Sequence, residues 1–492
     1  MLFIKQFKWL LLTIFFVVPF YVTAHHIVVD NTVDFNNMLQ TVKAGDTIIW
    51  KDGIYNDLKI NFKPTQNGTA QAYIVLKAQT AGKVIFKGSS QLFVAGSYLQ
   101  AEGFLFEGVN TLDNGDNVIE FGSQFKDNDN THHCRVTNCA VVNYTPKDAE
   151  VLQYSILLKG SYNEVDHCYF LGKSNKGPTL VVAYKKSKDY VDGSDAAPST
   201  HHHIHHNYFG FRTYTENGGE CMRIGDSKTS FTKGYNVIEN NFFEDEKIEA
   251  EVISNKSFCN IYRFNSFVNN DGALVLRHGQ QCVVYGNYFN SPASKNTSGG
   301  IRIINPYQTV FNNYIENVAG GSSVMKSPIC IMAGLKGSAL NEYYPADSAI
   351  VAYNTVYNAV GPAITLGVGN AAKGKPFEAP QHVWVEGNSV MNTKGKNPVV
   401  FQIENTESTY LAQQNYYYNS ISVDKGFQKI TQSDVVSTNI TSNKNININK
   451  TLVNVINSRL AKYNIFLNDT DITHFNPAWI VTKKDVGVSW LH

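Results

Sequence analysis

Two carboxylates separated by one residue, Glu249 and Glu251, are the first candidates for chemistry in this sequence. On a β-strand, residues two apart point to the same side, so both carboxylates would face one site. The amide oxygen of Asn217 joins them if its segment lies alongside. Carboxylate and amide oxygens are the hard ligands that Ca²⁺ prefers, and soft ligands suited to zinc are scarce nearby. We therefore predict a calcium site formed by Asn217, Glu249 and Glu251.

Two cationic residues, Lys256 and Arg277, follow the acidic pair. A metal ion beside cations suits a substrate that carries its own negative charge, such as the carboxylate of a uronic acid. Neutralising that carboxylate lets charge spread from C5 into the carboxyl group as the C5 proton leaves. Lys256 can take this proton if nearby positive charge and partial burial favour its neutral form. Arg277 can stabilise or protonate the departing oxygen at C4, so the set predicts β-elimination of a polyuronate.

The elements that position these residues are predicted from a repeated motif. Alternating polar and apolar residues end in Asn or Cys followed by an aromatic or aliphatic residue, and the shortest intervals between copies are 22 to 26 residues. The β-branched and aromatic runs have strand length and period-two alternation. Stacked units of this kind predict an all-β fold, a right-handed parallel β-helix, with loop insertions in the longer units. The nine copies are centred on Asn138, Cys168, Asn207, Asn241, Asn265, Asn287, Asn313, Asn354 and Asn388.

The repeated Asn has a predicted structural use. At one corner of each coil it would adopt left-handed backbone geometry and hydrogen-bond to the Asn above and below, forming a ladder. Measured from the Asn of their own coils, six polar residues lie 8 to 15 residues farther along the chain. Coils stacked in register would therefore gather them on one lateral face: Asn217, Glu249, Glu251, Lys256, Arg277 and Arg302.

The two ends of the chain differ from the repeats. Residues 33–57 read as a short amphipathic helix followed by a strand and a turn, which suits a cap over the open sheet edge of the first coil. Beyond about residue 400 the pattern fades, and residues 401–492 are predicted to form C-terminal coils or a cap. We expect residues 25–492 to form one β-helix domain.

The N-terminus resembles an export signal. Lys5 and Lys8 precede an apolar run, residues 9–20, and small residues end at Ala24. This run is shorter than the roughly 20 residues that a bilayer span requires, so we predict a signal peptide at residues 1–24 that is cleaved after Ala24. The mature protein would be periplasmic or secreted, without membrane association.

Composition excludes other classes of partner. The chain has 492 residues, of which 43% are hydrophobic and 17% charged, and signal removal lowers its formal net charge from +1 to −1. Such a chain folds but has no overall field that attracts nucleic acid. The seven cysteines form no CxxC pair and are predicted to be buried thiols. We expect a monomer.

The run HHHIHH, residues 201–206, has the composition of a metal site. Alternation along a strand would send its imidazoles to opposite faces. We therefore do not predict metal binding there.

Three segments resemble the signature of polysaccharide lyase family 6, which contains alginate lyases and chondroitinase B. They are NGGECMRIG (Asn217–Gly225), EAEVISNKS (Glu249–Ser257) and LRHG (Leu276–Gly279). The resemblance covers essentially the whole mature chain and implies an exported β-helix enzyme. It implies that Asn217, Glu249 and Glu251 hold calcium, that Lys256 is the Brønsted base and that Arg277 is the Brønsted acid. It also implies that Glu220, Arg223, His278 and Arg302 line the substrate subsites, although Glu220 and Arg223 suit a supporting salt bridge equally well.

Four functions compete. The first is a calcium-dependent lyase of alginate, and the second is the same chemistry on dermatan sulfate. Binding sulfate groups would call for extra basic residues along the cleft, but Arg459 is the only arginine after Arg302. A glycoside hydrolase would need a close pair of acid and base carboxylates, and no Asp pair lies on the predicted face. A carbohydrate-binding β-helix would need neither Lys256 nor Arg277. Preference for mannuronate or guluronate, and endo or exo action, stay open at this point.

Overall fold

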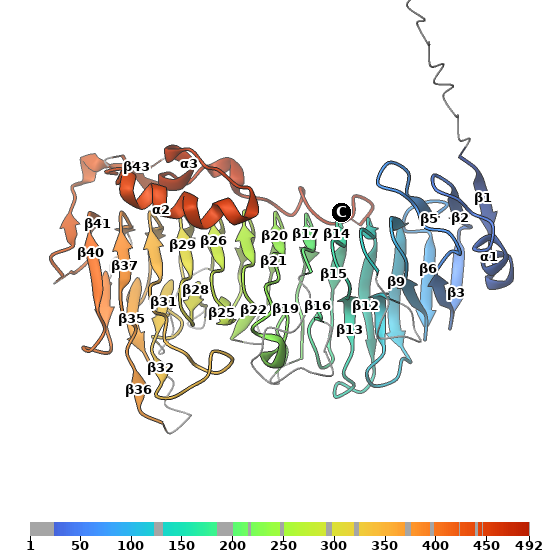
Figure 1. Ribbon diagram of the computed structural model, residues 1–492, viewed down its shortest axis with the longest axis horizontal. Helices are drawn as coiled ribbons and strands as arrows, with labels where there is room; N and C mark the ends of the chain where they lie inside the picture. Colours follow the sequence, from blue (N-terminus) through green and yellow to red (C-terminus); the bar gives the residue numbers. More distant parts are fainter. Residues whose placement is uncertain are drawn as a thin grey trace, which may run out of the picture.

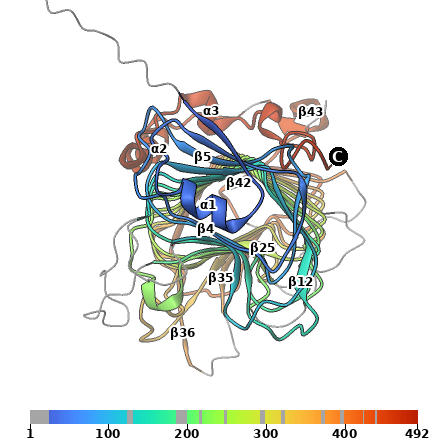
Figure 2. The same cartoon turned by 90° about the vertical axis from the view of Figure 1, so that its right-hand side faces the viewer.

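The computed structural model describes residues 24–122, 131–184, 200–214, 218–246, 250–291, 298–318, 324–369, 375–393, 398–422, 424–437, 441–444 and 446–491. In these residues the chain winds repeatedly through three long parallel sheets, called A, B and C here. The result is an elongated coil, seen from the side in Figure 1 and along its axis in Figure 2. The predicted parallel β-helix is confirmed.

From β2 to β39 each coil contributes one strand to each sheet in the order A, B, C. Sheet A contains β1 (His26–Val29), β2 (Thr47–Trp50), β5 (Ile74–Ala78), β8 (Leu99–Glu102), β11 (Arg135–Thr137), β14 (Glu164–Asp166), β17 (His203–His205), β20 (Val237–Glu239), β23 (Ile261–Arg263), β26 (Val283–Tyr285), β29 (Thr309–Phe311), β33 (Ile350–Ala352), β37 (Val383–Glu386) and β40 (Tyr410–Gln413). Sheet B contains β3 (Gly53–Asn56), β6 (Val84–Gly88), β9 (Phe104–Asn110), β12 (Ala140–Pro146), β15 (Tyr169–Leu171), β18 (Tyr208–Phe209), β21 (Phe242–Glu244), β24 (Ser266–Val268), β27 (Tyr288–Asn290), β30 (Tyr314–Glu316), β34 (Thr355–Tyr357), β38 (Ser389–Met391), β41 (Asn415–Tyr418) and β42 (Phe427–Lys429). Sheet C contains β4 (Lys59–Phe62), β7 (Gln91–Val94), β10 (Asn117–Phe121), β13 (Tyr154–Leu158), β16 (Leu180–Val182), β19 (Met222–Ile224), β22 (Glu251–Lys256), β25 (Ala273–His278), β28 (Ile301–Ile303), β31 (Ile329–Met332), β35 (Ile364–Val368) and β39 (Phe401–Ile403).

The remaining described elements lie outside these sheets. Two short antiparallel pairs are β32 (Gly334–Leu335) with β36 (Phe377–Glu378) and β43 (Val435–Ser437) with β44 (Thr441–Asn443). The helices are α1 (Thr32–Met38), η1 (Ser227–Thr229), η3 (Gln432–Asp434), α2 (Lys450–Leu460), η4 (Ala461–Tyr463), α3 (Asp469–Thr473) and η5 (Pro477–Trp479).

The core lies inside the coil and is built from like residues stacked one coil apart. Alternation along each strand sends one set of side chains inward, as in β5, where every second residue is buried. Phenylalanines in sheet B form a continuous stack, with ring centroids 4.4 to 5.1 Å apart. Its members are Phe170, Phe209, Phe243, Phe267 and Phe289. Parallel in-register pairing therefore explains why the sequence repeats the same residue types.

The predicted Asn ladder is present at the corner between sheets A and B. Each side-chain amide donates to the amide oxygen of the Asn one coil farther on, at 2.9 to 3.1 Å. The ladder runs through Asn207, Asn241, Asn265, Asn287, Asn313, Asn354, Asn388 and Asn415.

The left-handed residue at this corner differs from the prediction. It is the residue just before each ladder position, for example His206 and Asn240, both with φ of 52°. The ladder Asn itself has no positive φ, and its backbone N–H donates to the side-chain oxygen of the next Asn. In the first predicted copy Asn138 is this left-handed residue, and Cys139 takes the ladder position, since Tyr169 donates to its carbonyl.

The N-terminal cap is also present. Asn31 accepts from the backbone N–H of Asp34 and starts α1, and Phe35 of α1 packs against Trp50 with ring centroids 5.3 Å apart. In Figure 2, α1 lies across the end of the first coil. This helix covers the open end of the core, as the sequence predicts.

The C-terminal region divides into two parts. β39 to β42 continue the three sheets, and the chain then turns back along the outside of the coil (Figure 1). α2 packs its buried leucines, isoleucine and valine on an apolar patch of the outer face of sheet A, around Tyr285 and Phe311. Val486 and Val488 pack farther along, on the outer face of sheet B. This segment therefore covers lateral apolar surface of the sheets.

The seven cysteines all lie in described segments, and each is buried and free, as predicted. Among the described residues, no helix has the length and apolar character needed to cross a membrane. Of the predicted signal peptide, residues 1–23 lie outside the described part of the chain.

Candidate active site

Four neighbouring strands of sheet C, namely β19, β22, β25 and β28, carry most of the predicted site residues. Arg223 pairs with Ser254, Ser254 with Val275, and Val275 with Arg302, so these four residues form one row across the strands. Because adjacent strands are about 4.8 Å apart, the row places Arg223 and Arg302 about 14 Å from each other. A substrate lying across the strands would meet several coils at once.

A β-bulge interrupts the pairing of β22 with β25. Asn255 pairs with Leu276, but Lys256 pairs with His278, so Arg277 is the extra, unpaired residue. A bulge of this kind redirects the side chain at the extra position. The bulge therefore decides where the predicted acid, Arg277, points relative to the predicted base, Lys256.

A second irregularity lies at the start of β22. Glu251 pairs with Ala273, and Ile253 pairs with Leu274, which leaves Val252 as the extra residue. Residues 252–255 are buried, whereas Glu251 and Lys256 at the two ends are partly exposed. The two site residues predicted on this strand, the calcium ligand Glu251 and the base Lys256, are thus the ones at its irregular, partly exposed ends.

Glu220 is the buried acid that holds the basic residues together. Its Oε1 lies 3.8 Å from Lys256 Nζ and 3.7 Å from Arg223 Nη1. Arg223 also donates to the hydroxyl of Tyr154 at 3.0 Å. The backbone carbonyl of Glu220 accepts from Arg212, and this bond fixes the backbone at Glu220. This geometry is compatible with both predicted roles of Glu220 and Arg223, as substrate subsite residues and as a supporting salt bridge, because their ion pair lies beside Lys256.

Arg277 is held on three sides. Its Nε lies 4.0 Å from Glu251 Oε1, and its Nη1 donates to the carbonyl of Glu342 at 3.2 Å. The guanidinium carbon stands 3.9 Å from the ring centroid of Tyr343. Arg277 is therefore oriented before any substrate arrives, with its charge shared between a carboxylate, a carbonyl and an aromatic face.

His278 is buried and lies next to the cations. Its Nε2 is 3.0 Å from Ser227 Oγ. Burial, followed by the positive charges of Arg277 and Lys256, lowers the pKa of His278 well below its ordinary value, so the ring is neutral. A cleft of about 350 Å³ opens at Arg277 and His278, and its lining also includes Ser227, Leu335, Asn341, Glu342, Tyr343 and Lys375.

Arg302 lies farther from this group. It is 9% exposed, and its Nε donates to the carbonyl of Met325 at 3.3 Å. The segment at Met325 therefore covers it, and a substrate would reach only the edge of its side chain.

Of the three predicted calcium ligands, Glu251 lies among the described residues, and Asn217 and Glu249 do not. Glu251 is suited to the task because its carboxylate is partly exposed at the end of β22 and faces the Arg277 side of the site. Two carboxylates and an amide form a set of hard oxygen donors that fits Ca²⁺.

Several residues of the site were missed by the sequence analysis. They lie outside the signature segments, and no local pattern marks them: Tyr154, Ser227, Glu342, Tyr343 and Lys375. One signal was available for Glu342 and Tyr343, since both lie in the long insertion between the repeats at Asn313 and Asn354. Insertions of a solenoid fall on one side and often carry binding residues.

Two imidazoles of the run at 201–206 lie on one face of the sheet, contrary to the prediction that alternation sends its imidazoles to opposite faces. His203 and His205 are two apart on β17, so they share the outer face of sheet A, while Ile204 between them is buried. With Glu164 of β14 they form a group whose ligand atoms all lie within 4.8 Å of one another.

A family model described as Chondroitinase B matches residues 29–467. The chain belongs to the chondroitinase B family. The resemblance to polysaccharide lyase family 6 seen in the sequence is thereby confirmed.

Solved structures of family 6 proteins agree. The alginate lyase AlyGC is 29% identical, with a TM-score of 0.80 over 95% of this chain, and the chain spans 59% of the length of AlyGC. A mannuronic acid specific family 6 lyase from human gut microbiota is 25% identical, with a TM-score of 0.71 and coverage of 95% of this chain and 96% of that one. Another family 6 lyase, Pedsa3628 from Pseudopedobacter saltans, is 25% identical, with a TM-score of 0.65 over 81% of this chain and 93% of that one. No relative was detected among curated proteins.

Proposed function

We propose that this family 6 chain is an exported, calcium-dependent lyase that cleaves alginate by β-elimination and leaves 4,5-unsaturated uronate ends. The observation that carries the proposal is the bulge between β22 and β25. It places Lys256 opposite His278 and leaves Arg277 as the extra residue beside Glu251. An amine and a guanidinium thus stand on neighbouring coils, next to the cleft and to an acidic residue.

In this mechanism Lys256 removes the proton from C5 of the uronate. The electron pair of the C5–H bond becomes the C4–C5 double bond as the bond from C4 to the glycosidic oxygen breaks. Arg277 stands at the departing oxygen, where its fixed guanidinium stabilises the developing charge or supplies a proton. The stack on Tyr343 and the bond to Glu342 keep it in place.

The neutral ring of His278 serves a different purpose. Because burial and the neighbouring cations keep it uncharged, it adds no further positive charge beside Lys256. Ser227 fixes its orientation through the contact with Nε2. A neutral, oriented imidazole at the cleft can hydrogen-bond a sugar hydroxyl without competing for the proton that Lys256 takes.

Calcium would be held by Asn217, Glu249 and Glu251. When bound, it supplies neutralisation of the substrate carboxylate, which favours loss of the C5 proton. Glu251 supports this assignment because it lies 4.0 Å from Arg277, on the side where a substrate carboxylate must meet positive charge.

Alginate is favoured as the substrate by two observations. The relative with 29% identity is an alginate lyase, and the gut relative is specific for mannuronic acid. Few arginines are available to bind sulfate, since the chain has only one after Arg302. The match to the chondroitinase B model makes dermatan sulfate the second candidate substrate.

Export is proposed from the N-terminal pattern of lysines, an apolar run and small residues ending at Ala24. N-terminal sequencing of protein recovered from the periplasm or medium should begin at His25. A chain that keeps Met1 and stays in the cytoplasm would contradict export without affecting the lyase assignment.

The test of the activity is ultraviolet absorbance of the unsaturated uronate, followed on alginate and separately on dermatan sulfate. We expect a rise on alginate with Ca²⁺ that chelator abolishes. Lys256→Ala should lower kcat by about 10²- to 10⁴-fold, the range typical of a lost general base. Lys59→Ala, an exposed lysine at the start of β4 in the same sheet, is the matched control and should keep full activity. A rise on dermatan sulfate alone would change the substrate, and no rise on either polymer would overturn the proposal.

A further inference from the structure

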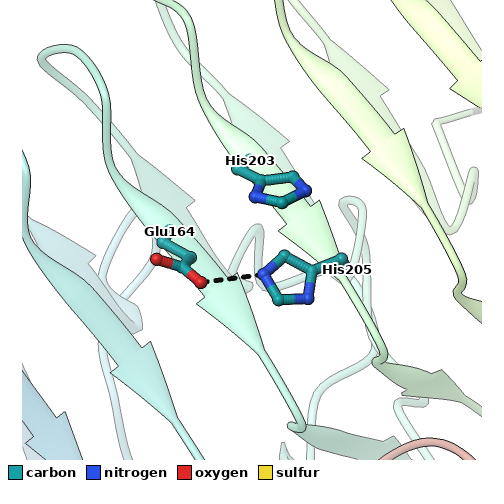
Figure 3. Close-up of side chains that lie close together, drawn as sticks. All are labelled: Glu164, His203 and His205. Atoms are coloured by element: carbon teal, nitrogen blue, oxygen red, sulfur yellow. Dashed lines mark hydrogen bonds and ion pairs between the residues drawn. The ribbon is translucent and has the colours of Figure 1, made fainter.

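The outer face of sheet A carries a group of imidazoles and carboxylates, whereas the candidate active site lies on sheet C. Glu164 on β14 pairs with His203 on β17, and Asp166 pairs with His205, so these four residues occupy two adjacent strands in register. Figure 3 shows Glu164, His203 and His205 projecting from the same face of the two strands. The mechanism proposed above uses none of them.

The three side chains are close enough to bind one ion. One ligand atom from each lies within 4.8 Å of the other two. His205 Nε2 is 2.8 Å from Glu164 Oε1, and the rings of His203 and His205 have centroids 4.0 Å apart. An ion of about 2 Å bond length placed among them would require only small side-chain shifts.

We propose that Glu164, His203 and His205 form a binding site for a divalent transition-metal ion of the zinc class. Two imidazoles and one carboxylate on one face leave coordination positions open to water, a pattern found in zinc and non-haem iron sites. Imidazole nitrogens are poor ligands for calcium, so this ion differs in kind from the calcium proposed on sheet C.

The ligands are supported by a surrounding set of partners. His203 Nε2 is 2.7 Å from Glu239 Oε1, and His205 Nδ1 is 2.8 Å from His206 Nδ1. A carboxylate that accepts from one ring nitrogen orients the imidazole and makes its other nitrogen a better ligand. The Glu239 contact can play this part for His203 when the ion takes its other nitrogen.

Glu164 is not the main partner of the neighbouring arginine, Arg135. Arg135 lies 3.6 Å from Glu164, but it makes its two short bonds, of 2.7 and 2.5 Å, to Asp166. Asp166 is thus the main partner of Arg135, and the Glu164 carboxylate makes only a longer contact with it.

Solvent can reach the site. The side chain of His203 is 43% exposed and that of Glu164 is 33% exposed, whereas His205 beneath them is 12% exposed. An ion here would tie β14 to β17, the paired sheet A strands of two neighbouring coils. It would therefore stabilise the junction between these two coils.

This inference is independent of the lyase proposal, and its test uses binding. The mature chain, made without a polyhistidine tag, is treated with chelator, returned to buffer with Ca²⁺, and titrated with Zn²⁺ by calorimetry. We expect one Zn²⁺ per chain and an upward shift of Tm. Glu164→Gln keeps the shape of the side chain and should weaken binding at least about tenfold, as should His205→Asn. His382→Asn is the matched control, since His382 is exposed and its positive φ is tolerated by Asn.

Two results would overturn the inference. One is the absence of Zn²⁺ binding to the parent protein. The other is binding that Glu164→Gln and His205→Asn leave unchanged, which would place the ion elsewhere, for instance at the N-terminal histidines. Circular dichroism of each variant, together with its lyase activity, shows whether the β-helix is intact, and Glu164→Gln answers the question if His205→Asn fails to fold.

Discussion

Lys256 on β22 lies opposite His278 on β25, one residue beyond the position that an unbroken ladder would give it. The shift arises because Arg277 is bulged out between Leu276 and His278. Asn305 of the next coil donates to the carbonyl of Arg277 and holds the bulge from one side. Leu276 is therefore buried in the core, Arg277 lies on the substrate side, and His278 lies in the wall of the cleft.

The closeness of Arg277 to Tyr343 predicts that the aromatic ring positions the acid. Tyr343→Ala removes the ring under the guanidinium and should lower kcat about tenfold, because cation–π contacts of this kind contribute about 1 to 2 kcal/mol. Tyr343→Phe keeps the ring and should retain most of the activity. Steady-state kinetics on alginate measures both. Equal losses in the two variants would show that the hydroxyl, and not the ring, matters.

Calcium dependence should be traced to Glu251. Chelator is expected to abolish activity, and added Ca²⁺ should restore it. Glu251→Gln retains the size of the side chain but removes one negative charge from the predicted ligand set, so the Ca²⁺ concentration for half-maximal activity should rise on the order of tenfold.

The control for this experiment is Glu407→Gln, an exposed glutamate in the last coils. It should need no more Ca²⁺ than the parent. If Glu251→Gln also leaves the Ca²⁺ requirement unchanged, Glu251 is not a ligand and only its contact with Arg277 remains.

The Asn ladder should contribute strongly to stability. Asn287 accepts from the backbone and side-chain N–H groups of Asn265 and donates to Asn313 and to the carbonyl of Tyr262. Asn287→Ala removes the bonds to the buried backbone N–H of Asn265 and carbonyl of Tyr262, and each buried group that loses its partner costs about 1 to 3 kcal/mol. We therefore expect a loss of roughly 2 to 4 kcal/mol in the free energy of unfolding, allowing for partial compensation.

Urea denaturation followed by circular dichroism measures this loss. Asn56→Ala, at an exposed position of β3, is the comparison and should change stability by less than about 0.5 kcal/mol. Similar effects of the two substitutions would mean that water replaces the ladder bonds.

Glu246 predicts a pH dependence of stability. Burial raises the pKa of Glu246 to about 7 from an ordinary value of 4.5, although Arg212 opposes the shift. Between these two values the folded chain keeps a proton that the unfolded chain has lost. Stability therefore falls as pH rises through this window, and it levels off above the folded pKa.

Glu246→Gln removes this titration. The variant should gain roughly 1 to 3 kcal/mol relative to the parent above pH of about 8, and much less below about 5. Urea unfolding at both pH values, at constant Ca²⁺, measures the difference. A difference that does not change with pH would show that Glu246 is already ionised in the folded chain.

The sequence alone determined the repeating architecture. Parallel in-register stacking demands the same residue type at the same place in every coil, so the recurring Asn and the aromatic runs reveal the solenoid without structural information. The helix before the first coil was predictable for a similar local reason, since an open sheet edge needs a cover. The order and spacing of Glu251, Lys256 and Arg277 also sufficed to propose a reaction, because these residues are close in the chain.

The tertiary structure decided which of these groups touch. The bulge at Arg277 depends on how β25 pairs with β22, and a strand does not reveal its pairing partner's register in its own sequence. Tyr343 reaches Arg277 from a loop inserted two coils farther on. Glu220, just before β19, contacts Lys256 at the end of the neighbouring strand β22. The left-handed corner residue and the pairing of Glu164 with His203 were hidden for the same reason. Each depends on contacts between coils, whose alignment is set only when the loops between them have folded.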